Sequence, residues 1–105
     1  MINLLSLFGF GKNKIKEALR NGAVVIDVRT PREFDEGHIP QSLNIPVDRI
    51  NSSAQRIKGM NKPIIFCCAS GMRSNTAVSV MKQNGLKEVY NGGSWQSVLK
   101  LIKSL

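Results

Sequence analysis

The sequence has few of the residues that build disulfide frameworks or metal sites, because it contains one histidine and two cysteines, Cys67 and Cys68. Adjacent cysteines rarely satisfy disulfide geometry without strain. One histidine and two adjacent cysteines also lack the spacing of a four-ligand zinc site. We therefore expect no structural disulfide, no bound metal and no cofactor. A chain without a disulfide scaffold fits a reducing compartment, and catalysis or burial remains as the role of the thiols.

The sequence also lacks a long apolar run. No stretch approaches the roughly 20 apolar residues that a membrane-spanning helix needs. Residues 1–10 are rich in Leu, Ile and Phe, but Lys12, Lys14 and Lys16 follow this segment, whereas a signal peptide has its positive charge before the apolar run. We interpret the segment as a docking arm or a short helix, and we expect a cytoplasmic protein that binds no membrane.

Acidic residues are scarce, since 7 Asp and Glu stand against 15 Lys and Arg, which gives a net charge of +8. Such a positive field draws anions toward the protein. The basic residues are scattered, however, and no basic segment is interleaved with aromatic residues as a single-strand binding surface would be. We therefore expect small anionic substrates and no nucleic-acid partner.

The order of secondary-structure signals indicates one α/β domain without internal repeats. Short β-branched runs alternate with amphipathic segments, which predicts parallel strands joined by helices that cover both faces of a sheet. Residues 91–93, Asn-Gly-Gly, predict a turn before the last helix. The expected strands are 23–28, 43–45, 63–68 and 88–90. The expected helices are 13–21 after a cap at Asn13, short helices at 47–50 and 54–58, 74–84, and a closing helix after a cap at Ser94.

A thiol stands where the most apolar strand ends, in the segment 64–74, IIFCCASGMRS. In open parallel sheets, sites lie at the carboxyl ends of the strands. The amides after Cys68 can form an anion-binding nest, the following helix adds the positive end of its dipole, and Arg73 adds a full charge. Each of these favours a thiolate, so we predict that Cys68 is reactive at neutral pH. The contrasting interpretation is a buried, inert thiol, which we expect for Cys67.

Three parts of the sequence resemble the signatures of rhodanese-type sulfurtransferases. The loop CASGMRS is similar to the family's active-site loop, written C-x-x-G-x-R-S. The match runs in the correct order from about residue 13 to residue 102. The similar segments are 68–74 for the active-site loop, 27–34 (DVRTPREF), 37–40 (GHIP) and 44–46 (NIP) for the first signature, and 90–93 (YNGG) with Trp95 for the second.

The resemblance implies a rhodanese-like α/β fold with a parallel five-stranded sheet and helices on both faces. Residues 13–105 would form this domain, and residues 1–12 would form an apolar N-terminal arm that has no counterpart in the family. Gln41 and Ser42 stand where the family usually has Gly and Ala, a departure that loosens one turn.

The resemblance also implies roles for single residues, with Cys68 as the catalytic sulfur carrier. We expect Asp27 or Glu33 to hold Arg73 in place by a charge-assisted hydrogen bond, and Arg29 is a candidate for substrate contact. His38 lies far from the thiol in sequence, and we expect it to be structural. The residues implied to bind the anionic donor are Ala69, Ser70, Gly71, Met72, Arg73 and Ser74.

The activity implied is transfer of sulfane sulfur from thiosulfate or a persulfide donor, through a Cys68 persulfide, to cyanide, a thiol or a sulfur-carrier protein. A phosphatase of the same fold needs its arginine six positions after the cysteine, and Arg73 is five positions after Cys68. An arsenate reductase, in which Cys67 would take part, is compatible with the loop. A non-catalytic or carrier module that docks a partner protein is a further hypothesis. Inactive relatives typically lose the cysteine or the loop, and this chain retains both.

Overall fold

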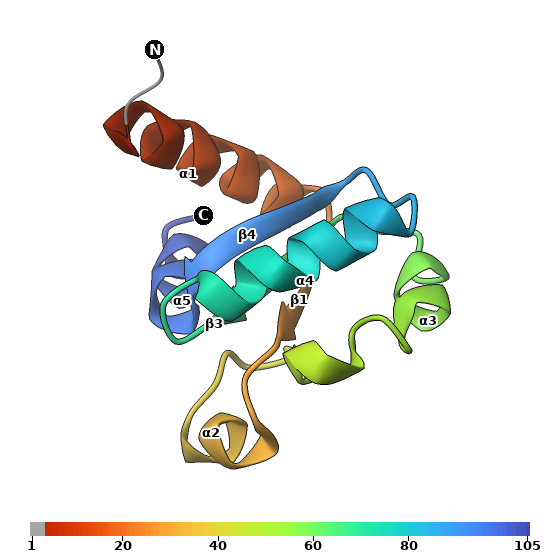
Figure 1. Cartoon of the computed structure of the whole chain (residues 1–105). Coiled ribbons are helices and arrows are strands. Elements are labelled where there is room, and N and C mark those ends of the chain that lie inside the picture. Colours follow the sequence, from red (N-terminus) through yellow and green to blue (C-terminus); the bar gives the residue numbers. More distant parts are fainter. Residues whose placement is uncertain (1–3) are drawn as a thin grey trace.

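The computed structural model describes residues 4–105, with side chains from residue 11 onward, and shows an α/β fold (Figure 1). Its centre is a sheet of four parallel strands in the order β2-β1-β3-β4. The strands are β1 (Val24–Asp27), β2 (Leu43–Asn44), β3 (Ile64–Cys68) and β4 (Val89–Ser94). The helices are α1 (Leu4–Arg20), α2 (Pro31–Glu36), η1 (Val47–Arg49), α3 (Ala54–Lys58), α4 (Met72–Gln83) and α5 (Trp95–Lys103).

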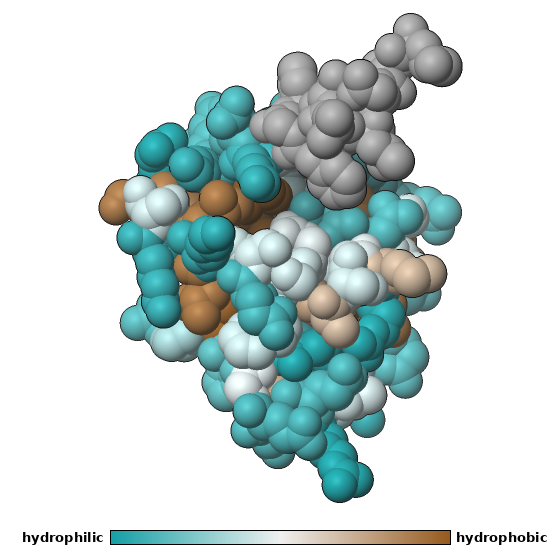
Figure 2. Space-filling view, turned by 90° about the vertical axis from the view of Figure 1, so that its left-hand side faces the viewer, coloured by the Kyte–Doolittle hydropathy of each residue, from teal (hydrophilic) through white to brown (hydrophobic). Residues whose placement is uncertain are grey.

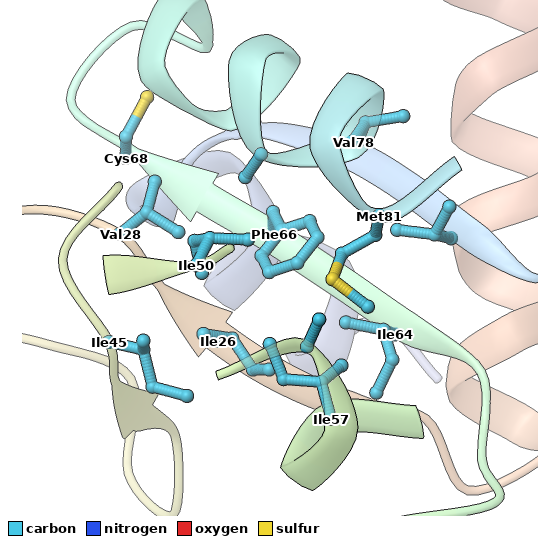
Figure 3. Close-up of a cluster of buried hydrophobic side chains, with 13 residues drawn as sticks. Ile26, Val28, Ile45, Ile50, Ile57, Ile64, Phe66, Cys68, Val78 and Met81 are labelled. Carbon is cyan, nitrogen blue, oxygen red and sulfur yellow. The ribbon is translucent and has the colours of Figure 1, made fainter. Parts of the chain in front are cut away.

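Strand β3 lies between β1 and β4 and is buried at every position. It is apolar throughout, as a parallel strand covered on both faces must be. Its side chains alternate between two hydrophobic clusters. Ile64, Phe66 and Cys68 belong to the cluster beneath α3 and α4 (Figure 3), whereas Ile65 and Cys67 belong to the cluster beneath α1 and α5. The two adjacent cysteines therefore lie on opposite faces of the sheet.

The number of strands differs from the five that the family resemblance implied, since the part of the chain that the structure describes forms four. The four strands expected from residue patterns are all present, with ends shifted by a few residues at most. The residues before β1 form α1, in which buried Ile15 and Ala18 have helical spacing and pack in the same cluster as Val98. This segment therefore covers a face of the sheet and adds no strand.

Helix α1 begins at Leu4, so the predicted cap at Asn13 is wrong and Asn13 lies inside the helix. The apolar residues before it continue the helix, and Gly11 has open space around it and does not interrupt it. The first three residues and the side chains of residues 4–10 lie outside the described part of the chain. The division of the chain into an apolar N-terminal arm at residues 1–12 and a domain at residues 13–105 remains a prediction.

Strand β4 includes residues 91–93, which were predicted to form a turn. The pairing of β3 with β4 is irregular between Phe66 and Cys68, and Gly93 has a φ of +82°. The chain thus bends at this point while it stays in the sheet. The predicted cap at Ser94 is confirmed, because its hydroxyl accepts a hydrogen bond from the Ser97 amide at the start of α5.

The surface seen in Figure 2 is mostly hydrophilic, with apolar residues gathered in a smaller area. Among residues 4–105, no helix has both the length and the apolar character that crossing a membrane requires.

Candidate active site around Cys68

The loop after β3 is short, because α4 begins at Met72 and not near Ser74 as predicted. Gly71 has a φ of +98°, a left-handed conformation that favours glycine, and its carbonyl accepts the first backbone hydrogen bond of α4 from Asn75. A side chain here would also crowd Gly93, whose Cα lies 3.3 Å from an ideal Cβ position. Arg73 and Ser74 are consequently placed on the first turn of the helix, next to the end of β3.

The Cys68 side chain lies at the carboxyl end of β3 and points toward the loop and α4 (Figure 3). The residue is only 1% exposed. The amide of Gly71 donates a hydrogen bond of 2.9 Å to Cys68 Sγ. Burial raises the pKa of the Cys68 thiol, but the Ser74 hydroxyl and the amides of Ser74, Ser70 and Gly71 stabilise the anion and outweigh burial. The pKa of Cys68 is therefore lower than the ordinary value of a thiol.

Ser74 brings a buried hydroxyl to this thiol. It is close enough to Cys68 to lower the pKa of the thiol, but its oxygen makes no hydrogen bond to any other described residue. A buried hydroxyl without a partner costs about 1–3 kcal/mol. An anion at the sulfur, or a group bound to the sulfur, can supply the missing acceptor.

Cys67 lies in a different environment, packed in the cluster with Val25, Ile65 and Val98. Burial, followed by the negative charge of Asp27, raises the pKa of the Cys67 thiol far above the ordinary value. The prediction that Cys67 is a core residue is confirmed. Cys67 and Cys68 are successive residues of one strand, and successive side chains of a strand point to opposite faces of a sheet. The Cys67 side chain therefore lies on the face opposite to that of Cys68.

Arg73 makes a two-pronged ion pair with Glu33, with Nη1 to Oε1 at 2.7 Å and Nη2 to Oε2 at 3.0 Å. Of the two carboxylates expected beside Arg73, Glu33 makes this contact. Glu33 is also the third residue of α2, where it forms a capping box with Thr30. The bonds from Arg73 first, and then that from the Thr30 amide, lower the pKa of Glu33 to about 2.

Asp27 instead pairs with Arg29, whose Nη2 lies 2.7 Å from Asp27 Oδ2. Both residues are buried. Arg29 also donates to the carbonyl oxygens of Glu33 and Gly37, at 3.3 and 2.7 Å, and its guanidinium lies 5.1 Å from the ring centre of Trp95. Its donors thus hold the middle and the C-terminal end of α2 against the sheet. This geometry favours a positioning role for Arg29 over the predicted substrate contact.

The remaining residues of the loop differ in exposure. Ala69 and Ser70 are exposed, and Met72 is 78% exposed at the first position of α4. Ser70 contributes its amide to the stabilisation of the Cys68 anion. Met72 is one of two large hydrophobic residues described as exposed.

Sequence reasoning missed Asn91, which donates a hydrogen bond of 3.0 Å from its side-chain amide to the carbonyl of Gly71. Asparagine directly before two glycines was interpreted as a turn, although an amide side chain beside glycines can also bond across to a neighbouring loop. His38 was expected to be structural, and it stacks on Phe34 with a ring separation of 3.6 Å. Its Nδ1 lies 2.6 Å from the Phe34 carbonyl oxygen.

Among the side chains that the structure describes, no three histidine, cysteine or carboxylate residues come together as metal ligands. The groups that can act chemically at this site are a stabilised thiolate, the donors around it, and the paired charges of Arg73 and Glu33.

Known proteins from several organisms are similar to this chain. It is 35% identical over 99 residues to YqhL, an uncharacterized protein of Bacillus subtilis, with 88% of this chain and 78% of YqhL covered. It is 34% identical over 76 residues to the thiosulfate sulfurtransferase GlpE of Pseudomonas syringae, with 71% of each chain covered. The human single-domain sulfurtransferase TSTD1 has a similar structure, with a TM-score of 0.65, 27% identity, and 84% of this chain and 91% of that chain covered.

The family model described as the rhodanese-like domain matches residues 12–99, a range that includes all four strands and the loop after Cys68. With the parallel sheet, the cysteine at the end of its central strand and the short glycine-containing loop, this match shows that the chain belongs to the rhodanese-like domain family.

Proposed function

We propose that this protein is a sulfurtransferase that carries sulfane sulfur as a persulfide on Cys68. The observation that carries the proposal is the Cys68 thiol at the end of β3, whose sulfur accepts the Gly71 amide at 2.9 Å and whose pKa is lowered by the loop. Cysteine nucleophiles act as thiolates. A site that stabilises the thiolate without a histidine base suits attack on a sulfur atom, because such a step needs no proton transfer.

In the first half-reaction, the Cys68 thiolate attacks the outer sulfur of thiosulfate or of a persulfide. With thiosulfate, a bond forms between Cys68 Sγ and the outer sulfur, and the bond from that sulfur to the SO₃ group breaks. Sulfite leaves with the electron pair, and Cys68 carries an anionic persulfide. The Ser74 hydroxyl, which lacks a partner of good geometry among the described residues, and the amides of the loop stabilise this anion.

In the second half-reaction, a nucleophile attacks the outer sulfur of the persulfide. With cyanide, thiocyanate forms and the Cys68 thiolate is regenerated, so charge and atoms balance over the cycle. A thiol or a sulfur-carrier protein takes the place of cyanide in the cell. We expect this reaction in the cytoplasm and without a nucleic-acid partner.

A phosphatase of the same fold is the activity that the loop disfavours. The arginine of such a loop must contact a phosphate, whereas Arg73 is held by Glu33 and is five positions after Cys68. Hydrolysis of an aryl phosphate by the purified protein tests for this phosphatase activity.

Intact-mass spectrometry after treatment with thiosulfate tests the proposal. Wild type and Cys67→Ala are expected to gain the mass of one sulfur atom, whereas Cys68→Ser gains none. Cyanide should remove the added sulfur as thiocyanate. Uptake by Cys68→Ser but not by Cys67→Ala would make Cys67 the carrier. Turnover of the aryl phosphate with no sulfur uptake would replace the proposed activity.

A further inference from the structure

Two ion pairs lie near the carboxyl ends of β1 and β3, and in each pair one positive charge is opposed by one negative charge. Arg73 pairs with Glu33 through two hydrogen bonds, and Arg29 pairs with Asp27 through Nη2 and Nε. Arg73 is the one charged residue in the loop segment 68–74. The side chains next to Cys68 therefore supply no net positive charge to a bound donor.

This local balance contrasts with the net charge of +8 for the whole chain. The long-range positive field increases the encounter rate with anions. Once an anion is bound, however, groups within a few ångströms dominate, because salt screens the more distant charges. A dianion at the loop meets one cation, Arg73, whose charge is already opposed by Glu33, and it also meets the Cys68 thiolate.

Glu33 cannot easily leave Arg73, because its carboxylate is held on both sides. Glu33 Oε1 accepts hydrogen bonds from the amide and the hydroxyl of Thr30, both at 3.1 Å. The backbone of Glu33 is held in turn by Arg29. The side chains of Arg73 and Glu33 are 34% and 36% exposed, so the ion pair is accessible from solvent.

We propose that Glu33 determines the charge selectivity of the site: it disfavours dianionic sulfur donors such as thiosulfate relative to singly charged sulfane donors, such as thiosulfonates and small alkyl persulfides. The inference rests on the proposed sulfur transfer at Cys68. The cost of each additional negative charge on the donor is larger when the Arg73 charge is neutralised. Removal of the Glu33 charge should therefore help the dianion more than the monoanion.

Thiosulfate and methanethiosulfonate allow a test of this charge selectivity, because both donate a sulfane sulfur to the thiolate and their charges differ by one unit. Thiosulfate transfers its outer sulfur and releases sulfite, and methanethiosulfonate transfers its outer sulfur and releases methanesulfinate. In both reactions the thiolate forms the new S–S bond, the leaving group takes the electron pair, and Cys68 becomes a persulfide. The quantity to measure is the ratio of kcat/KM for thiosulfate to kcat/KM for methanethiosulfonate, with cyanide as acceptor and ionic strength held constant.

In Glu33→Gln this ratio should rise by about tenfold, because the charge of Arg73 is then no longer neutralised and attracts the dianion more strongly than the monoanion. Glutamine is accepted at this position of a capping box, so the start of α2 should be retained. The matched control is Asp35→Asn, which removes an exposed charge from the same helix without touching Arg73. Its ratio should stay within about twofold of wild type, because exposed charges are screened.

A double variant tests whether the ratio depends on the net charge of the Arg73–Glu33 pair. Glu33→Gln combined with Arg73→Gln removes both members of the pair, so its ratio should return to within about threefold of wild type. Thermal unfolding of each variant reports whether it is folded.

An equal loss of rate with both donors in Glu33→Gln would mean that Glu33 only positions Arg73, and a fall in the ratio would mean that it orients Arg73 toward the dianion. Either result overturns the inference while sulfur transfer itself stands. If wild type accepts sulfur from neither donor, the proposed function fails first, and the inference fails with it.

Discussion

The side-chain amide of Asn91 donates a hydrogen bond of 3.0 Å to the carbonyl oxygen of Gly71, and it thereby ties β4 to the loop after Cys68. The other end of the same side chain accepts the Gly93 amide at 2.8 Å. Gly71 in turn donates its own amide to Cys68 Sγ. The shape of the loop thus depends on a residue about twenty positions further along the chain.

Replacement of Asn91 by alanine should lower the rate of sulfur transfer from thiosulfate by about two- to tenfold, since a neutral hydrogen bond is worth about 0.5–1.5 kcal/mol. It should also raise the pKa of Cys68, because the Gly71 amide is less well held against the sulfur. The rate of alkylation by iodoacetamide as a function of pH measures that pKa. Asn75→Ala is the control, as Asn75 is exposed on α4. A pH profile identical in Asn91→Ala and wild type would show that the bond does not act on the thiol.

The buried Arg29–Asp27 pair should matter for folding more than any exposed pair. Arg29→Ala leaves the fully buried Asp27 without its partner, and removal of one member of a buried pair typically costs about 3–5 kcal/mol. Urea unfolding should show this loss. The control is Arg32→Ala, because Arg32 and Glu36 lie 3.9 Å apart with side chains 93% and 73% exposed. Its effect should stay within about 0.5 kcal/mol. Equal stability of the two variants would contradict the role of Arg29 in holding α2.

Gly92 lies where β4 packs against side chains of β3 and α5. An added Cβ would stand 2.5 Å from Val98 Cγ2 and 2.8 Å from Ile65 Cγ2. Gly92→Ala should therefore lower the free energy of unfolding by about 1–3 kcal/mol through overpacking. Gly11→Ala has open space in α1, and there the better helix propensity of alanine should leave stability unchanged or raise it by up to about 1 kcal/mol. Urea unfolding of both variants compares them, and the prediction fails if Gly92→Ala is as stable as wild type.

The lowered pKa of Glu33 predicts how the stability of the fold depends on pH. Arg73 first, and then the Thr30 amide, lower the pKa of Glu33 to about 2 in the folded chain, compared with roughly 4.3 in an unfolded chain. A lowered folded pKa means that the carboxylate stabilises the fold above the unfolded pKa, and that this contribution is lost as the pH falls toward about 2. NMR titration of the Glu33 carboxyl should give a midpoint near this value in wild type and a higher midpoint in Arg73→Ala. A midpoint near the unfolded value in wild type would show that the ion pair is absent in solution.

Local sequence signals predicted much of the fold because they act over short distances. The unbroken apolar run of β3, the glycine-containing loop and the Ser94 cap each depend on neighbouring residues, and the structure has them where they were expected. The start of α4 was placed too late, because the backbone of Gly71 ends the loop earlier than the polar side chains suggested. The fifth strand was an expectation from the family, and the residues described before β1 form a helix instead.

The sequence by itself determined that a thiol stands at the end of a buried strand, before a short loop and a helix that was predicted to begin near Ser74. This order of elements is sufficient to predict a reactive Cys68. Only the tertiary structure decided that Glu33 and not Asp27 holds Arg73, that Arg29 donates hydrogen bonds to the backbone of α2 and its C-cap, and that Asn91 supports the loop. These contacts join residues from different elements. They depend on the register of β3 with β1 and β4 and on the way in which α2 is held against the sheet, and no local pattern of residues specifies either of these.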